Sequence, residues 1–271
     1  MKKWLKITLG ILFAGGIIAL MSLANQQQGQ QELVNPDILI RITGEHAFLT
    51  EHELFVRLKR KGYIYNGLKQ SGLQVSKIER FIRSMTEVKD VKVYTNIGRK
   101  WEIEVTVRKP IARIYNQFDE NYYLDEDGVI MRSSSTHTAR VVVVTGFIPD
   151  KINAPSVSEI INNDTLKSIQ KLDDVYRISN YVCNDPLLQS LIGQIHLKKD
   201  GNFVLIPLVG GQKIIFGSAY SNEEVKLKMN KLKVFYKEGM PYEGWNKYDV
   251  INLKYKKQIV CRKADTFTEE N

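Results

Sequence analysis

The residues whose types could support chemistry include an acidic tetrad, Asp125-Glu126-Asp127-Gly128. Adjacent carboxylates can share a proton in acid–base catalysis, or they can bind calcium. The tetrad lacks the glutamate that an EF-hand places at the twelfth position of its loop. Aspartate and glycine between two strand-like segments are also typical of a hairpin turn. The sequence therefore predicts a solvated hairpin here, with no catalytic residue and no metal site.

The other reactive side chains are few and scattered. Cys183 and Cys261 could form a disulfide in an oxidising compartment, or each could be a small buried apolar group. No spacing of metal ligands connects the histidines, which are His46, His52, His137 and His196. Gly210-Gly211 lacks the lysine and the helix of a P-loop, which favours a tight turn. We expect neither a cofactor nor a metal.

The composition is that of a globular protein with a basic balance. The chain has 271 residues, of which 43% are hydrophobic and 25% charged, and its net charge is +9. Such a charge is compatible with nucleic acid, an anionic membrane or an acidic polymer as partner. Lysines recur in a helix-like stretch whose apolar stripe is formed by Val225, Met229, Leu232 and Phe235 or Tyr236. They form either a solvated face or an anion-binding face, and they are Lys226, Lys228, Lys231, Lys233 and Lys237.

The N-terminal residues predict a membrane anchor. Lys2, Lys3 and Lys6 surround Trp4 and precede an uncharged run over 7–24, which is long enough for a transmembrane helix. The lysines place residues 1–6 in the cytoplasm and the bulk of the chain outside, which argues against a nucleic-acid partner. A cleaved signal peptide ending near Ala24 is the alternative. A polar linker over 25–34 follows.

One strand and a proline break organise the rest of the chain. From Trp101 to Val107 apolar and polar residues alternate, which predicts a half-buried strand. Proline has no N–H for a sheet ladder, so Arg108, Pro110 and Ala112 mark a joint between two sheets. We expect Glu102, Glu104 and Arg108 to be solvated.

The segments on either side of this joint predict two domains. Over 35–108 the order is strand, helix, helix, strand, strand, with caps at Thr50 and Ser76. Over 109–263 strands predominate. Caps at Ser156, Asp185 and Ser221 start helices, the first of which runs through Leu172. The final element is one strand over 249–261 with Ile251, Leu253 and Tyr255 on one face, and a disordered tail over 264–271 follows it. The fold class is α+β.

These features, in this order, resemble the FtsQ/DivIB family of bacterial cell-division proteins, with most similarity to members from Bacteroidetes. The resemblance covers nearly the whole chain. It depends on the basic tail and anchor, the β-α-α-β-β module, Val107-Arg108-Lys109-Pro110-Ile111-Ala112, Tyr123-Leu124-Asp125-Glu126-Asp127-Gly128, Lys213-Ile214-Ile215-Phe216-Gly217 and Val250-Ile251-Asn252-Leu253-Lys254-Tyr255.

The resemblance implies a POTRA-type first domain and a mixed, mainly antiparallel β-domain. It implies a non-enzymatic, single-pass inner-membrane scaffold at the division septum, linking early division proteins to septal peptidoglycan synthesis. Other divisome proteins would bind the POTRA-type domain. The coiled-coil proteins FtsB and FtsL would bind by strand addition at the last strands. Tyr255 matches a tyrosine of that surface, and the expected partner-binding residues are Ile251, Leu253, Tyr255, Lys257 and Ile259.

Other interpretations of the same residues remain open. Some relatives carry a tryptophan beyond the matched tyrosine, where this chain has Cys261-Arg262-Lys263. Lys254, Lys256 and Lys257 could simply prevent aggregation between sheet edges. The whole chain could also be a POTRA-containing factor for envelope assembly or secretion, or a membrane-anchored cell-wall enzyme.

Overall fold

The computed structural model describes residues 2–42, 44, 48–96, 98–134 and 137–264. They divide into two compact units. Unit 1 comprises Met1–Thr43 and Leu49–Val107, and unit 2 comprises Gly44–Phe48 and Arg108–Asn271. The expected disordered tail lies outside the described residues, except for Ala264.

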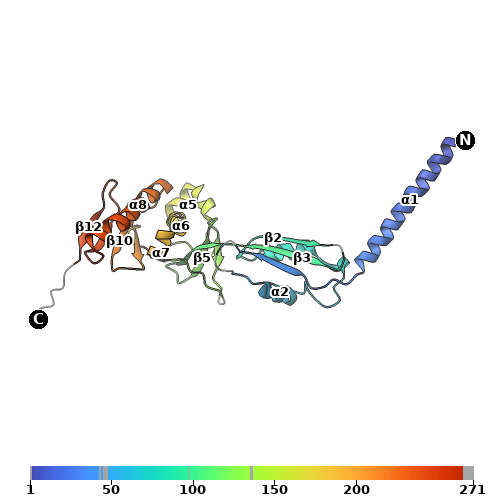
Figure 1. The fold of residues 1–271 in the computed structure, drawn as a ribbon, viewed down its shortest axis with the longest axis horizontal. Coiled ribbons are helices and arrows are strands. Elements are labelled where there is room, and N and C mark those ends of the chain that lie inside the picture. Colours follow the sequence, from blue (N-terminus) through green and yellow to red (C-terminus); the bar gives the residue numbers. More distant parts are fainter. Residues whose placement is uncertain (1, 43, 45–47, 97, 135–136, 265–271) are drawn as a thin grey trace. The chain divides into compact units, whose positions relative to one another are not determined.

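Unit 1 has the element order expected from the sequence, with a short 3₁₀ turn added between its two helices (Figure 1). Its elements are α1 (Lys2–Gly29), β1 (Asp37–Arg41), α2 (Glu51–Arg60), η1 (Gln70–Gly72), α3 (Val75–Arg83), β2 (Val88–Thr95) and β3 (Trp101–Val107). The three-stranded sheet has the order β1-β3-β2, in which β3 is parallel to β1 and antiparallel to β2.

The central strand of this sheet, β3, carries the core of unit 1. Its four apolar side chains are at most 1% exposed, whereas the residues between them are half-buried. The predicted alternation is therefore confirmed. Thr50 caps α2 by accepting the N–H of Glu53 at 3.2 Å. The predicted cap at Ser76 is wrong, because α3 already begins at Val75 and the Glu79 carboxylate accepts the N–H of Val93 on β2.

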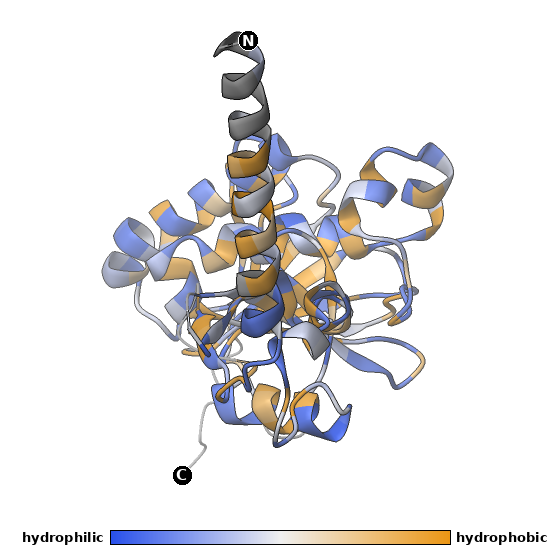
Figure 2. Ribbon diagram, turned by 90° about the vertical axis from the view of Figure 1, so that its right-hand side faces the viewer, coloured by the Kyte–Doolittle hydropathy of each residue, from blue (hydrophilic) through white to orange (hydrophobic). Residues whose placement is uncertain are grey.

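The first helix, α1, covers the segment expected to anchor the chain. Its described central turns are hydrophobic and its glutamine-rich end is hydrophilic (Figure 2). Among the residues that the structure describes, no helix is both long enough and apolar enough to cross a membrane. The side chains of Lys2, Lys3 and Lys6 lie outside the described set. The span over 7–24 is therefore not shown and stays a prediction.

Unit 2 is built on a nine-stranded mixed sheet with the order β12-β11-β10-β9-β8-β7-β4-β5-β6. Five pairings are antiparallel, and three are parallel: β4–β7, β7–β8 and β10–β11. The strands are β4 (Pro110–Tyr115), β5 (Asn121–Asp125), β6 (Ile130–Arg132), β7 (Val142–Gly146), β8 (Ile192–Leu197), β9 (Phe203–Pro207), β10 (Lys213–Gly217), β11 (Tyr248–Asn252) and β12 (Val260–Lys263). The mixed, mainly antiparallel sheet agrees with the expected fold class.

Helices cover one face of this sheet (Figure 1). They are α4 (Val157–Ile161), α5 (Asp164–Ile169), α6 (Leu172–Cys183), α7 (Pro186–Leu191), α8 (Asn222–Val234), the π-helical turn η2 (Phe235–Gly239) and α9 (Met240–Glu243). Ile195 and Ile214 of the sheet pack in one core with Ile178 of α6 and Met229 of α8. Val204 and Ile215, on the opposite face, remain half-exposed. Such a one-sided core is common for a sheet rich in antiparallel pairs.

The sequence located the helix starts of unit 2 better than the helix lengths. The side chains of Ser156, Asp185 and Ser221 cap α4, α7 and α8 as predicted. The single helix predicted from Ser156 through Leu172 is wrong. The Asn163 side chain caps a separate helix, α5, and a further break at Gln170 precedes α6.

Candidate functional site

The C-terminal hairpin contains the residues expected to bind a partner. The predicted single strand over 249–261 is wrong, because β11 ends at Asn252 and β12 begins only at Val260. The Asn252 side chain accepts the N–H of Lys254 at 3.1 Å, a local bond that turns the chain out of the strand. A loop over 253–259 connects the two strands.

The five expected partner residues differ in their accessibility. Ile251 and Leu253 are fully buried in the core of unit 2, so a partner cannot reach them in this fold. Tyr255 is 50% exposed and Lys257 is exposed. Ile259 is half-buried against the core. The accessible members therefore lie in the loop, not on the strand.

Lys231 of α8 holds this loop in place through hydrogen bonds to its backbone. Its ammonium donates hydrogen bonds to the carbonyl of Leu253 at 3.0 Å and to the carbonyl of Tyr255. Burial and, secondarily, the neighbouring Lys228 lower the pKa of Lys231. Sequence reasoning placed both lysines on a solvated or anion-binding face. The structure corrects this, since Lys228 is 5% exposed and pairs with Glu224 at 2.5 Å.

Strand β12 forms one edge of the nine-stranded sheet, because β11 is its one neighbour among the residues that the structure describes. The Ala264 N–H bonds the Lys247 carbonyl on the β11 side. Backbone groups alternate along a strand, so the N–H groups of Cys261 and Lys263 point to the open side. The Arg262 side chain of β12 pairs with the Asp249 carboxylate of β11 across the two strands. The edge thus offers unpaired donors and acceptors to an added strand.

An apolar groove of about 770 Å³ lies beside the start of this edge strand. Leu227 and Val234 of α8 are about half-exposed there, at 49% and 53%. The groove is completed by Asn230, Lys231, Phe235, Glu238, Gly239, Lys256, Lys257, Gln258 and Ile259. Sequence reasoning missed it, although Leu227, Lys231 and Val234 follow the helical spacing i, i+4, i+7 on a face separate from the core stripe.

The acidic tetrad forms a hairpin turn between β5 and β6, as predicted, but Asp125 is not solvated. Its carboxylate is fully buried, lies 2.7 Å from the Arg108 guanidinium and accepts the N–H groups of Asp127 and Val129 at 3.0 and 2.6 Å. Burial raises the pKa of Asp125, although the N–H of Val129 and Arg108 oppose this rise. The carboxylate therefore fixes a turn.

The joint residues are also less exposed than expected. The Arg108 side chain is only 18% exposed, which corrects the expectation of a solvated arginine. Pro110 begins β4, and Ala112 is buried in the core of unit 2. Strand β3 belongs to the small sheet and β4 to the large one, so one sheet does end and another begin here.

The remaining candidates for chemistry do not gather at one place. Cys183 and Cys261 are free, half-buried thiols, and burial raises the pKa of each. The His196 Nδ1 lies 3.0 Å from the Thr145 hydroxyl, and His46 lies outside the described residues. Within the described part of the chain, no three histidine, cysteine or acidic side chains are grouped to hold a metal ion.

A half-covered sheet that ends in an edge strand beside an apolar groove has the architecture of a protein-binding module. Residues 109–262, which contain this sheet, match the family described as FtsQ/DivIB, C-terminal related. The chain belongs to this family, as the sequence motifs predicted, and membership indicates a role in cell division. A comparison with curated proteins finds no significant match.

Proposed function

We propose that the chain is a non-enzymatic scaffold of the bacterial division complex, and that it binds an extended segment of a partner as an added strand on β12. The observation that carries this proposal is the combination of an open sheet edge with an adjoining apolar groove. FtsB- or FtsL-type coiled-coil proteins are the expected partners. Main-chain hydrogen bonds to the edge supply affinity, and side chains in the groove supply selectivity.

The charges around the groove favour an acidic partner segment. Lys256 and Lys257 are exposed at its rim, and no ion pair is described for either. Glu238 is the one carboxylate among the groove residues. An apolar side chain seated between Leu227 and Val234, with a carboxylate directed to the rim lysines, fits both properties of the groove.

Substitution at the centre of β12 tests this proposal. Cys261→Pro removes an N–H that faces the open side of the strand, whereas Cys261→Ala keeps it. We expect the proline variant to lose most recovery of FtsB- and FtsL-type proteins from dividing cells, and the alanine variant to retain it. Equal recovery by the two variants, with thermal melting and circular dichroism unchanged, would contradict strand addition at β12.

The loop residue Tyr255 supplies a second test of the same surface. Tyr255→Glu places a negative charge among the rim lysines and removes an exposed aromatic side chain. We expect partner recovery to fall while the fold is kept, since the ring is half-exposed. Undiminished recovery would show that Tyr255 does not belong to the binding surface. Strand addition at β12 is tested separately by the Cys261→Pro variant.

Unit 1 and the N-terminal segment complete the proposed scaffold. In this proposal unit 1 is a POTRA-type domain that recruits other division proteins, and residues 7–24 anchor the chain in the inner membrane at the septum. The support is the β-α-α-β-β order, the uncharged run behind three lysines, and the exposure of Leu12 and Phe13 at 75% and 73%. Alkaline extraction tests the anchor. The full chain should stay with the membrane fraction, and its release would contradict the anchor.

A further inference from the structure

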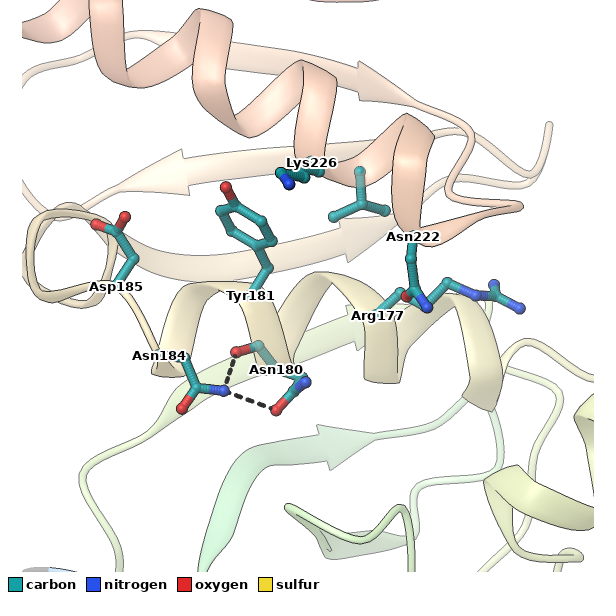
Figure 3. A pocket seen from close by; sticks show the side chains of 8 residues that line it. Arg177, Asn180, Tyr181, Asn184, Asp185, Asn222 and Lys226 are labelled. Carbon is teal, nitrogen blue, oxygen red and sulfur yellow. Dashed lines mark hydrogen bonds between the residues drawn. The ribbon is translucent and has the colours of Figure 1, made fainter.

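A second hollow on unit 2 lies between α6 and α8 and differs in chemistry from the apolar groove. This polar cleft has a volume of about 410 Å³, within the range of small-molecule sites. Figure 3 shows Tyr181 projecting from α6 and Asn222 projecting from α8 into the same space. The lining residues are Arg177, Asn180, Tyr181, Asn184, Asp185, Asn222, Val225 and Lys226.

Three carboxamide side chains dominate the polar lining of the cleft. Asn184 donates to the Asn180 side-chain oxygen at 2.9 Å and to the Asn180 carbonyl at the same distance. These bonds leave the Asn180 amide N–H groups and the Asn184 side-chain oxygen available. No hydrogen bond is described for the Asn222 side chain, which is exposed. The cleft therefore presents both donors and acceptors, from the Asn180–Asn184 pair at the end of α6 and from Asn222 at the start of α8 (Figure 3).

The charged groups of the cleft are largely neutralised by protein partners. Arg177 pairs with Asp173 at 2.6 Å and with Asp174 at 2.7 Å. Asp185 pairs with Lys233 at 2.7 Å. Lys226 is exposed, and no ion pair is described for it. Among the described lining residues, Lys226 is thus the one charged group without an ion pair, and a strongly charged ligand such as a phosphate ester finds no second uncompensated cation here.

Apolar surface adjoins these amides. Val225 is almost fully buried at the base of the cleft. The Tyr181 ring is half-buried, and its hydroxyl is held by the Asn230 side-chain oxygen at 3.0 Å. The Lys233 ammonium lies 5.7 Å from the ring centroid. An aromatic ring fixed at its polar tip gives a stable platform for the C–H groups of a ligand.

We propose that this cleft binds a saccharide unit, a neutral ligand rich in hydroxyl or acetamido groups. A carboxamide offers a donor and an acceptor side by side, which complements neighbouring hydroxyls or an acetamido group. The half-buried ring of Tyr181 contacts the apolar face of the sugar ring. A free sugar and a sugar unit within a glycan strand present the same groups, so both fit this description. This site goes beyond the proposed scaffold function and uses neither β12 nor the apolar groove.

Titration of the full chain with soluble probes tests the proposal. N-acetylglucosamine and its β-1,4-linked trimer serve as the free unit and the strand-like probe, and NMR of the asparagine side-chain amides gives the readout. We expect shifts confined to the cleft, with a dissociation constant on the order of 1 mM for the single sugar. Tighter binding of the trimer identifies a strand as the ligand, and equal binding identifies the free unit.

Matched variants make the outcome decisive. Asn180→Leu and Asn222→Leu keep the side-chain size and remove the hydrogen bonds, so each should weaken binding at least ten-fold. Asn246→Leu, outside the cleft, should not change it. Tyr181→Phe keeps the ring and loses only its hydrogen bond to Asn230, so it should weaken binding less than either asparagine variant. An absence of shifts in the cleft with both probes, or equal affinity in the Asn180, Asn222 and Asn246 variants, overturns the proposal. Cys261→Pro should bind the sugar normally, which separates this test from that of β12.

Discussion

The nine-stranded sheet has an outer strand at each edge, and these two edges, the β6 end and the β12 end, differ in how well they are covered. At one end, the β5–β6 turn is fixed by the buried Asp125 carboxylate and Arg108, and the Tyr176 hydroxyl donates to the Glu126 carbonyl at 2.8 Å. Met131 of the edge strand β6 is fully buried in a small cluster with Phe48, Tyr123 and Ala139.

At the other end, the half-buried Lys231 holds the β11–β12 loop by a hydrogen bond to the Leu253 carbonyl. Val260 of the edge strand is 41% exposed. Edge strands that are short and covered are protected from pairing, whereas an accessible edge is a template for another chain. The comparison indicates that the β6 end serves stability and that the β12 end is available for binding. Changes at the first end should alter the free energy of unfolding, and changes at the second should mainly alter partner affinity.

The largest effect is expected for Arg108→Met, which leaves the buried Asp125 carboxylate without its cation. Removing one partner of a buried ion pair costs about 3–5 kcal/mol of stability. Urea unfolding of unit 2 measures this cost. The matched control is Lys109→Met, because Lys109 pairs with Glu126 at 3.8 Å in a more exposed setting and should cost about 1 kcal/mol or less. Similar losses for the two variants would contradict a structural role for the β6 end.

Acidic pH should affect the same end through Asp150, whose backbone carbonyl accepts the Tyr122 hydroxyl of β5. Burial raises the pKa of Asp150 to about 6 from 3.8, against two N–H donors at the start of α6. Since the folded state binds this proton more tightly, the group contributes stability at pH below 3.8. That contribution is lost as the pH rises to about 6, a change of about 3 kcal/mol.

Unfolding measured between pH 3.5 and 7 checks this sign, with Asp150→Asn as the reference. In this variant the free energy of unfolding should no longer show the part of its pH dependence that Asp150 contributes. Asp249 at the β12 end should behave in the opposite way, because the Arg262 hydrogen bond lowers the pKa of its carboxyl. Parallel pH profiles for the natural chain and Asp150→Asn would refute the assignment.

A smaller effect on stability is expected for Lys231→Met. It removes hydrogen bonds from an ammonium to two carbonyls of the loop and should cost about 1.5 kcal/mol. Amide exchange over 253–259 should accelerate, and partner affinity should fall because the loop is less ordered before binding. Lys237→Met on the exposed side of η2 is the control. Unchanged exchange in Lys231→Met would show that the loop does not depend on this lysine.

The smallest effect is expected for Arg262→Gln, which breaks an exposed pair with Asp249 across the edge hairpin. Water and salt screen an exposed pair, so the midpoint of urea unfolding should change little. A loss as large as that of Arg108→Met would mean that the β12 end is as structural as the β6 end.

Local patterns in the sequence were sufficient for many of the elements and for most of the predicted helix starts. The alternation from Trp101 to Val107 gave β3, and the caps at Ser156, Asp185 and Ser221 gave three helix starts. These features depend on a few neighbouring residues. The breaks at Asn163 and Gln170 were missed, because apolar periodicity continues across them.

The candidate site was harder to predict, because it depends on contacts between distant residues. The groove combines α8 with the 256–259 loop, and Lys231 reaches carbonyls 22 and 24 residues away. Alternation alone placed Leu253 and Tyr255 on one face of a strand, whereas the chain leaves the strand at Asn252. The pairing of Arg108 with Asp125 likewise spans 17 residues.

Hydrogen exchange of the β12 amides tests the central claim most directly. The full chain is compared alone and with an FtsB-type partner, and the readout is protection at Cys261 and Lys263, whose N–H groups face the open side. Strand addition predicts that both amides become protected in the complex, while amides of β6 are unchanged. Binding of the partner without protection at these two amides would contradict the account.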